Sequence, residues 1–201
     1  MADTHLFLAS DGIGAIPEFL GGRTGLTVAF VPTAVNVLPD LPFVAEQRDR
    51  LIGMGLEVLD LDLDSVDPGE IASRVAAADM LFVTGGNVFY LLQRARETPF
   101  EAALRTHIEA GKPYAGTSSG SSIMGPDPTQ VSFSDRSLAP RLTSTEGLGI
   151  VEFEVLPHFD WEELAEERQA MLAKATVPVV PLRDDQAVIV EGATHRVVAS
   201  P

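Results

Sequence analysis

The chain has 201 residues, 45% of them hydrophobic and 21% charged. This composition is typical of a globular protein and excludes a disordered chain, and we expect residues 1–201 to form a single domain. The sequence has no cysteine, which excludes disulfides, thiol nucleophiles and cysteine-bound metals, and its formal net charge of −15 disfavours nucleic acid as a partner, because an acidic surface repels phosphate.

The N-terminus shows no targeting signal. The segment "MADTHLFLAS" lacks a basic region followed by a long apolar core. No apolar run approaches the roughly 20 residues that a membrane span requires. We therefore expect a cytoplasmic protein without a membrane partner.

Apolar and amphipathic segments alternate through the first two thirds of the chain. Alternating or continuous apolar runs predict strands, and helical spacing with Gly and Pro boundaries predicts helices. The predicted strands are 5–10, 26–34, 57–64, 80–86 and 113–119, and the predicted helices are 42–55, 68–79, 87–97 and 99–111. Such alternation requires crossover connections, so we expect a doubly wound α/β fold with a mostly parallel sheet sandwiched by helices.

The last third has a different pattern. A loop is predicted at 125–147, followed by strand 149–159, helix 161–175, strand 177–182 and a terminal hairpin turning at Glu191 and Gly192. In a doubly wound sheet, ligands bind at the carboxyl ends of the strands. Two glycine-bearing turns, "TGGN" and "GTSSG", end predicted strands and should lie on that rim.

The stretch "YAGTSSGSSIMG" at 114–125 allows three interpretations. A flexible linker does not fit, because predicted elements flank it. A phosphate loop does not fit either, because Lys112 precedes the serines instead of closing the loop. The third is a Gly-x-Ser-x-Gly nucleophile elbow, which fits only when centred on Ser118, between Gly116 and Gly120. A plain serine-rich turn that caps the next helix remains the alternative.

Two further features favour the elbow. The backbone N–H of Gly86, at the end of the predicted strand 80–86, and that of Ser119 could together bind an oxyanion. Asn87 could cap the next helix. A serine nucleophile also needs a base. Of the four histidines, His158 is the best placed, because it follows a predicted strand in "VLPHFD".

The motifs "TGGNVFYLL", "YAGTSSGSSIMG" and "LPHFD", in this order and spacing, resemble the peptidase E family of serine peptidases. That family contains aspartyl dipeptidases, with cyanophycinases as more distant relatives. The resemblance runs from the first strand to about Asp184 and implies a fold similar to that of class I glutamine amidotransferases. It implies Ser118 as nucleophile, His158 as general base, and Gly86 and Ser119 as the oxyanion-hole amides.

The third member of the family's triad is an acid on a late strand-to-turn segment, usually a glutamate. The matching stretch here is "PLRDDQA", which implies Asp184, with Asp185 as its neighbour. Asp135 in "SFSDRS" is the competing candidate, and its alternative role is to cap a loop.

The resemblance is weaker on the substrate side. Aspartyl dipeptidases have a basic residue early in the helix region after the histidine motif, whereas Arg168 is the only base in "DWEELAEER" and comes late, among acids. They also have a C-terminal extension, whereas this sequence ends at Pro201, like a short form. Both differences argue against cleavage of Asp-X dipeptides. Asn87 is a candidate substrate contact.

We therefore expect a serine peptidase-like hydrolase that acts on small peptides or amides and needs no cofactor or metal. Two alternatives remain open. One is a non-catalytic binding or sensing protein on the same scaffold. The other is a cyanophycinase-like exopeptidase, disfavoured by the absence of an obvious basic groove. A monomer and a homodimer are both compatible with the sequence.

Overall fold

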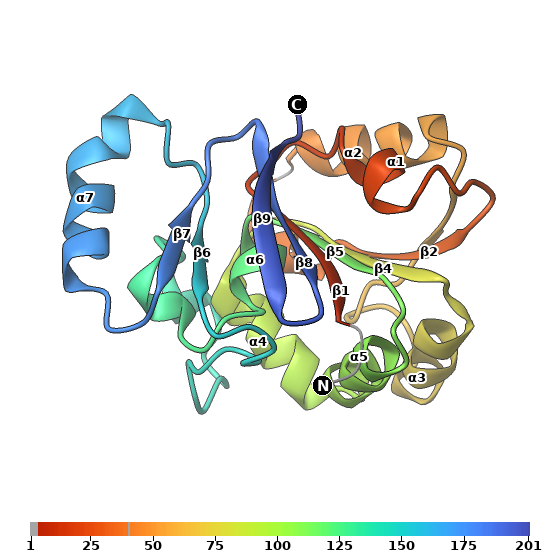
Figure 1. Ribbon diagram of the computed structural model, residues 1–201. Helices are drawn as coiled ribbons and strands as arrows, with labels where there is room; N and C mark the ends of the chain where they lie inside the picture. Colours follow the sequence, from red (N-terminus) through yellow and green to blue (C-terminus); the bar gives the residue numbers. More distant parts are fainter. Residues whose placement is uncertain (1–3, 40) are drawn as a thin grey trace.

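The computed structural model describes residues 4–39 and 41–201, and its centre is a seven-stranded sheet in the order β3-β2-β4-β5-β1-β8-β9 (Figure 1). The first five strands in sequence are mutually parallel, and β8 and β9 add an antiparallel hairpin beside β1. The strands are β1 (His5–Ala9), β2 (Thr27–Val31), β3 (Glu57–Asp60), β4 (Met80–Val83), β5 (Tyr114–Thr117), β8 (Gln186–Glu191) and β9 (Thr194–Ala199).

Helices cover both faces of this sheet, as a doubly wound fold requires. In Figure 1, α1 (Ile16–Phe19) and α2 (Phe43–Gly53) lie above the sheet, and α3 (Pro68–Ala77), α4 (Val88–Glu97) and α5 (Phe100–Glu109) lie below it. The predicted fold class is therefore confirmed. The short helix α6 (Ser119–Ser122) follows β5 directly.

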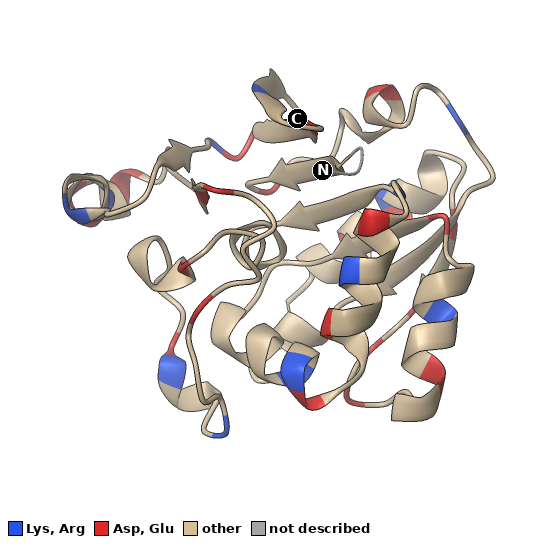
Figure 2. Ribbon diagram, turned by 60° about the horizontal axis from the view of Figure 1, so that its bottom comes forward, with Lys and Arg blue, Asp and Glu red and all other residues tan. Residues whose placement is uncertain are grey.

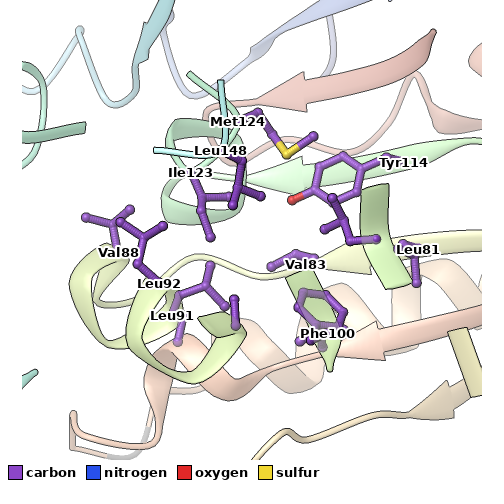
Figure 3. Close-up of a cluster of buried hydrophobic side chains, with 14 of the residues drawn as sticks. Leu81, Val83, Val88, Leu91, Leu92, Phe100, Tyr114, Ile123, Met124 and Leu148 are labelled. Carbon is purple, nitrogen blue, oxygen red and sulfur yellow. The ribbon is translucent and has the colours of Figure 1, made fainter. Parts of the chain in front are cut away.

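Strand alternation divides the core into two clusters. In β1, Leu6 and Leu8 pack into the cluster beneath the sheet, whereas Phe7 and Ala9 pack into the cluster above it. Such opposite placement follows from the two-residue period of a strand. Figure 3 shows the lower cluster, where Tyr114, Ile123 and side chains of β4, α4 and α5 meet. The strands β4 and β5, all of whose residues are buried, are thereby anchored in the core.

A second, two-stranded parallel sheet lies beside the main one and pairs β6 (Glu154–Leu156) with β7 (Val179–Pro181). The 3₁₀ turn η4 (Glu162–Leu164) and α7 (Ala165–Lys174) connect these strands and form the left side of Figure 1. The predicted strand 149–159 is thus wrong over most of its length. The N–H groups of Leu148 and Ile150 donate to carbonyls at the end of α6, so this part of the chain packs against a helix end.

Smaller differences from the sequence-based elements have local causes. The strand predicted at 57–64 ends at Asp60, because the Asp62 carboxylate accepts from Thr33, Asn36 and Asp64 and turns the chain. The strand predicted at 26–34 ends at Val31, before the 3₁₀ turn η1 (Thr33–Val35). Helix α1 was not predicted, and the β8–β9 turn falls at residues 192–193.

The charged residues are distributed over many elements. In Figure 2, the acidic positions are scattered along helices and loops, with no single acidic band. Among the residues that the structure describes, no helix is long and apolar enough to cross a membrane.

Candidate active site

Ser118 lies in the sharp turn between β5 and α6, and its backbone is strained. Its φ of 47° and ψ of −110° fall in a region that non-glycine residues rarely occupy. A Cβ on Gly116 would lie 2.5 Å from the backbone of Gly120, and a Cβ on Gly120 would lie 2.2 Å from the carbonyl oxygen of Val83. Both glycines are therefore required by backbone packing, as an elbow centred on Ser118 predicts.

His158 and Asp184 reach the same place from the small sheet. The parallel register pairs Leu156 with Pro181, and His158 and Asp184 follow shortly after these two residues. Because the carboxyl ends of paired parallel strands lie at the same edge, the two side chains become neighbours. His158 also has a positive φ of 55°, so both it and Ser118 occupy strained backbone.

The three side chains form one chain of hydrogen bonds. The Ser118 Oγ lies 3.1 Å from the His158 Nε2, and the His158 Nδ1 lies 2.6 Å from the Asp184 Oδ1. Asp184 also accepts hydrogen bonds from Ser10 Oγ and Trp161 Nε1, both at 2.8 Å.

The Asp184 carboxylate is held in its ionised form. Burial alone would raise its pKa, but the hydrogen bonds from His158, Trp161 and Ser10 outweigh burial and lower the pKa to about 2. Asp184 can therefore orient the His158 imidazole and balance a positive charge on it at neutral pH.

Two backbone N–H groups adjoin Ser118. Gly86 has a φ of 142°, and a Cβ there would lie 2.4 Å from the carbonyl group of Ala34, so no side chain fits. Ser119 is the first residue of α6, and its hydroxyl donates to the Gly86 carbonyl at 2.5 Å. In the part of the chain that the structure describes, neither N–H has a protein acceptor. Both remain available to a ligand oxygen.

Asp135 and Asn87 do not contact His158. The Asp135 side chain accepts from the N–H of Ser137 and caps the 3₁₀ turn η3 (Arg136–Leu138), the loop-capping role anticipated as its alternative. The Asn87 side-chain oxygen caps α4 by accepting from Phe89 and Tyr90, and its Nδ2 donates to the Asp135 carbonyl. Both residues nevertheless line the cavity beside Ser118. A substrate contact by Asn87 stays a prediction.

The cavity beside Ser118 has a volume of about 300 Å³, and Arg168 forms part of its wall. Arg168 reaches this cavity although it comes late in the segment "DWEELAEER". The η4 turn precedes α7 and turns the chain back, so that the Arg168 Nη1 donates to the carbonyl of Pro157, next to His158.

Arg168 is a buried cation that pairs with no carboxylate of residues 4–39 and 41–201. Its side chain is 2% exposed, its Nε has no hydrogen-bond acceptor, and its guanidinium lies 5.0 Å from the centre of the Phe133 ring. Burial lowers its pKa, although Asp184 and other acids oppose the shift. A buried cation of this kind favours an anionic ligand group.

Three further residues surround the triad and were not predicted from the sequence: Ser10, Asp11 and Trp161. Ser10 and Asp11 directly follow β1, whose carboxyl end lies beside that of β5. Because ligands in a doubly wound sheet bind at the carboxyl ends of the strands, the end of the first predicted strand could have indicated both residues. Trp161 packs against His158, with ring centres 4.4 Å apart, and no sequence signal marks that contact.

The other histidines lie outside this site. The His107 Nε2 bonds the carbonyl of Pro113, His5 packs on Phe19, and His195 packs on Phe153. Among the described residues, no group of three or more His, Cys, Asp or Glu side chains could hold a metal ion.

Comparisons with known proteins identify the family to which this chain is similar. A family model described as peptidase family S51 matches residues 9–198. An uncharacterised peptidase from Pasteurella multocida is 32% identical, over 94% of each chain. A peptidase E from Streptomyces coelicolor is 31% identical over 84% of this chain and 69% of its own length. The crystal structure of a candidate peptidase E from Listeria monocytogenes has a TM-score of 0.92 at 30% identity and covers 98% of this chain and 99% of its own.

Proposed function

This chain belongs to peptidase family S51 and is a peptidase, and we propose that it cleaves short peptides through a Ser118–His158–Asp184 triad. The observation that carries this proposal is the unbroken series of hydrogen bonds from the strained Ser118 through His158 to Asp184.

The proposed reaction is acyl transfer through a covalent intermediate. The His158 Nε2 takes the hydroxyl proton of Ser118 while the Ser118 Oγ attacks the peptide carbonyl carbon. The N–H groups of Gly86 and Ser119 donate to the oxyanion of the tetrahedral intermediate, each contributing about 3 kcal/mol. His158 then gives the proton to the leaving nitrogen as the C–N bond breaks. A water molecule, deprotonated by His158, hydrolyses the acyl-enzyme and regenerates Ser118.

The cavity that contains Arg168 favours a substrate with a carboxylate near the scissile bond. A volume of about 300 Å³ is at the small end of ligand pockets and suits one amino-acid side chain with its backbone. A carboxylate there could pair with the Arg168 guanidinium, which lines the cavity and whose Nε has no acceptor among the described residues. Arg168 thus reopens the possibility of an acidic acyl residue, against which its sequence position had argued.

A dipeptide assay tests both parts of this proposal. We expect the wild type to cleave Asp-Leu faster than the isosteric Asn-Leu, and Ser118→Ala to cleave neither. Arg168→Gln should remove the preference for Asp while retaining the fold, as measured by its melting temperature. Thermal stabilisation of the wild type by these dipeptides without product would instead indicate a binding protein. Cleavage by Ser118→Ala at the wild-type rate would exclude the triad.

A further inference from the structure

A second cavity, of about 350 Å³, adjoins the first one at Ser118. The two cavities share four residues, Gly86, Ser118, His158 and Trp161. A peptide whose carbonyl group lies at Ser118 can therefore reach into both cavities. Their remaining walls differ in charge, since the first contains the Arg168 guanidinium with the Asp135 carboxylate, whereas the second contains the carboxylates of Asp11 and Asp184 and, among the described residues, no basic side chain.

Asp11 is a carboxylate that forms no ion pair with any residue that the structure describes. Its Oδ1 accepts one hydrogen bond, at 3.2 Å, from the Gln47 Nε2. Within residues 4–39 and 41–201, no basic side chain lies within 4.0 Å of its carboxylate oxygens. Arg50, a cation that interacts with Asp11 at longer range, donates to the carbonyl of Pro201 at 2.7 Å.

The surroundings of Asp11 penalise its negative charge. Asp11 is exposed at the mouth of the cavity, but its partial desolvation, and then the negative charge of Asp184, raise the pKa of Asp11, and the effects of His158, Arg50 and Gln47 oppose them only in part. The repulsion by Asp184 persists, because the hydrogen bonds from His158, Trp161 and Ser10 keep the Asp184 carboxylate ionised. A cation that entered the cavity would stabilise the Asp11 carboxylate.

The other walls of the cavity suit a cation as well. Phe43 at the start of α2 and Trp161 both line it. Trp161 is 40% exposed, so part of its indole remains uncovered. A carboxylate combined with aromatic rings is a common environment for ammonium and guanidinium groups, because both the charge and the ring faces attract cations.

We propose that the cavity around Asp11 is a subsite for a cationic group of the substrate, an ammonium or a guanidinium, which pairs with the Asp11 carboxylate. This inference rests on the proposed function, in that it places the scissile bond at Ser118. Together with Arg168, it describes a dipolar substrate, with an anionic group in one cavity and a cationic group in the other. The cation has two possible sources, the peptide's own α-ammonium group or a Lys or Arg side chain.

Asp11→Asn tests the charge with little change of shape. The amide oxygen can still accept from Gln47, so the structural role of Asp11 is retained. Asp49→Asn is the matched control, because Asp49 is an exposed acid on α2 that lines neither cavity. Both substitutions are made in Ser118→Ala, so that binding is measured without turnover.

Calorimetry then gives the Kd of four peptides at pH 7: Asp-Lys, Asp-norleucine and the N-acetylated form of each. We expect Asp11→Asn to weaken binding of the cationic ligand about tenfold relative to its neutral counterpart, and Asp49→Asn to leave that ratio unchanged. If Asp11→Asn removes the preference for Asp-Lys over Asp-norleucine, the cation is a side chain. If it removes the preference for the free peptides over their N-acetylated forms, the cation is the α-ammonium group.

Two results would overturn the subsite. One is that both ratios are the same with and without the Asp11 carboxylate, and the other is that none of the four peptides binds. Cleavage of the same peptides by the wild type is scored separately. A protein that binds with the expected ratios but never cleaves would retain the subsite and refute the peptidase mechanism.

Discussion

The main sheet and the small sheet supply the two halves of the candidate site in different ways. The main sheet holds Ser118 in a turn packed so tightly that Gly116 and Gly120 have no room for a side chain. The small sheet holds His158 and Asp184 at the ends of three-residue strands, with side chains 20% and 34% exposed. The nucleophile is thus fixed by backbone packing, and the base and acid are fixed by hydrogen bonds.

This difference indicates that the two halves should respond differently to substitution. Substitution of the elbow glycines Gly116 and Gly120 should affect folding, whereas changes around His158 should affect catalysis in a folded protein. The predictions below test this contrast, in order of decreasing expected effect.

The largest effect is expected at Asp184. Asp184→Asn would present an amide that favours the wrong imidazole tautomer, so we expect kcat to fall about 10⁴-fold with the fold intact. Asp135→Asn should cost far less, since Asp135 caps a loop and does not contact His158. Steady-state kinetics measures kcat of both variants. If Asp135→Asn lost more activity than Asp184→Asn, Asp135 would be the acid of the triad.

A large loss of stability is expected in the elbow. Gly120→Ala places a Cβ 2.2 Å from the Val83 carbonyl oxygen, and we expect it to destabilise the fold by about 4 kcal/mol or more. Gly53→Ala is the matched control, because no atom lies within 4 Å of a Cβ at this position of α2. It should stabilise the protein by about 0.5–1 kcal/mol. Equal urea midpoints for the two variants would contradict the packing argument.

The small sheet also contains a buried acid, Glu154, and this makes stability depend on pH. Burial raises the pKa of Glu154 to about 7, although a hydrogen bond from the Asp127 N–H opposes the shift. Between about pH 4.5 and 7, the Glu154 carboxyl group therefore stays protonated in the folded protein, whereas it is ionised in the unfolded chain. The stabilisation is present below about pH 4.5 and is lost as the pH rises through 7.

Urea unfolding at pH 5 and pH 8 measures this effect. The wild type should lose up to about 3 kcal/mol more stability over this interval than Glu154→Gln, whose side chain does not titrate. An equal loss in both proteins would show that Glu154 does not carry the proton.

The smallest effect is expected at Ser10, which joins the two halves. Its hydroxyl donates to Asp184 and accepts from the His158 N–H at 2.7 Å. Ser10→Ala should lower kcat about tenfold, because one hydrogen bond of the base and one of the acid are lost. Ser73→Ala, on the exposed face of α3, is the control. Wild-type kcat in Ser10→Ala would show that Ser10 does not position the pair.

The same contrast explains what could be predicted from sequence. The elbow is encoded locally, because Gly116, Ser118 and Gly120 lie within five residues and their spacing has one steric reason. The strand–helix alternation likewise predicted the doubly wound fold. The class I glutamine amidotransferase-like topology stays a prediction.

The small sheet could not be predicted in the same way. Its two strands pair with each other and not with the main sheet. Where β6 begins therefore depends on tertiary contacts of the preceding chain, such as those of Leu148 and Ile150 with the end of α6. The position of Arg168 depends on how α7 turns back toward Pro157. Such features arise from tertiary packing, which a periodic pattern does not record.

The central claim is that the Ser118 hydroxyl, activated by His158, is the nucleophile. Labelling with a fluorophosphonate probe, followed by mass mapping of the modified peptide, tests it most directly. We predict one adduct, on Ser118, in the wild type, and none in Ser118→Ala with an unchanged melting temperature. Equal labelling of Ser118→Ala, or an adduct on another serine of the elbow, would contradict the account.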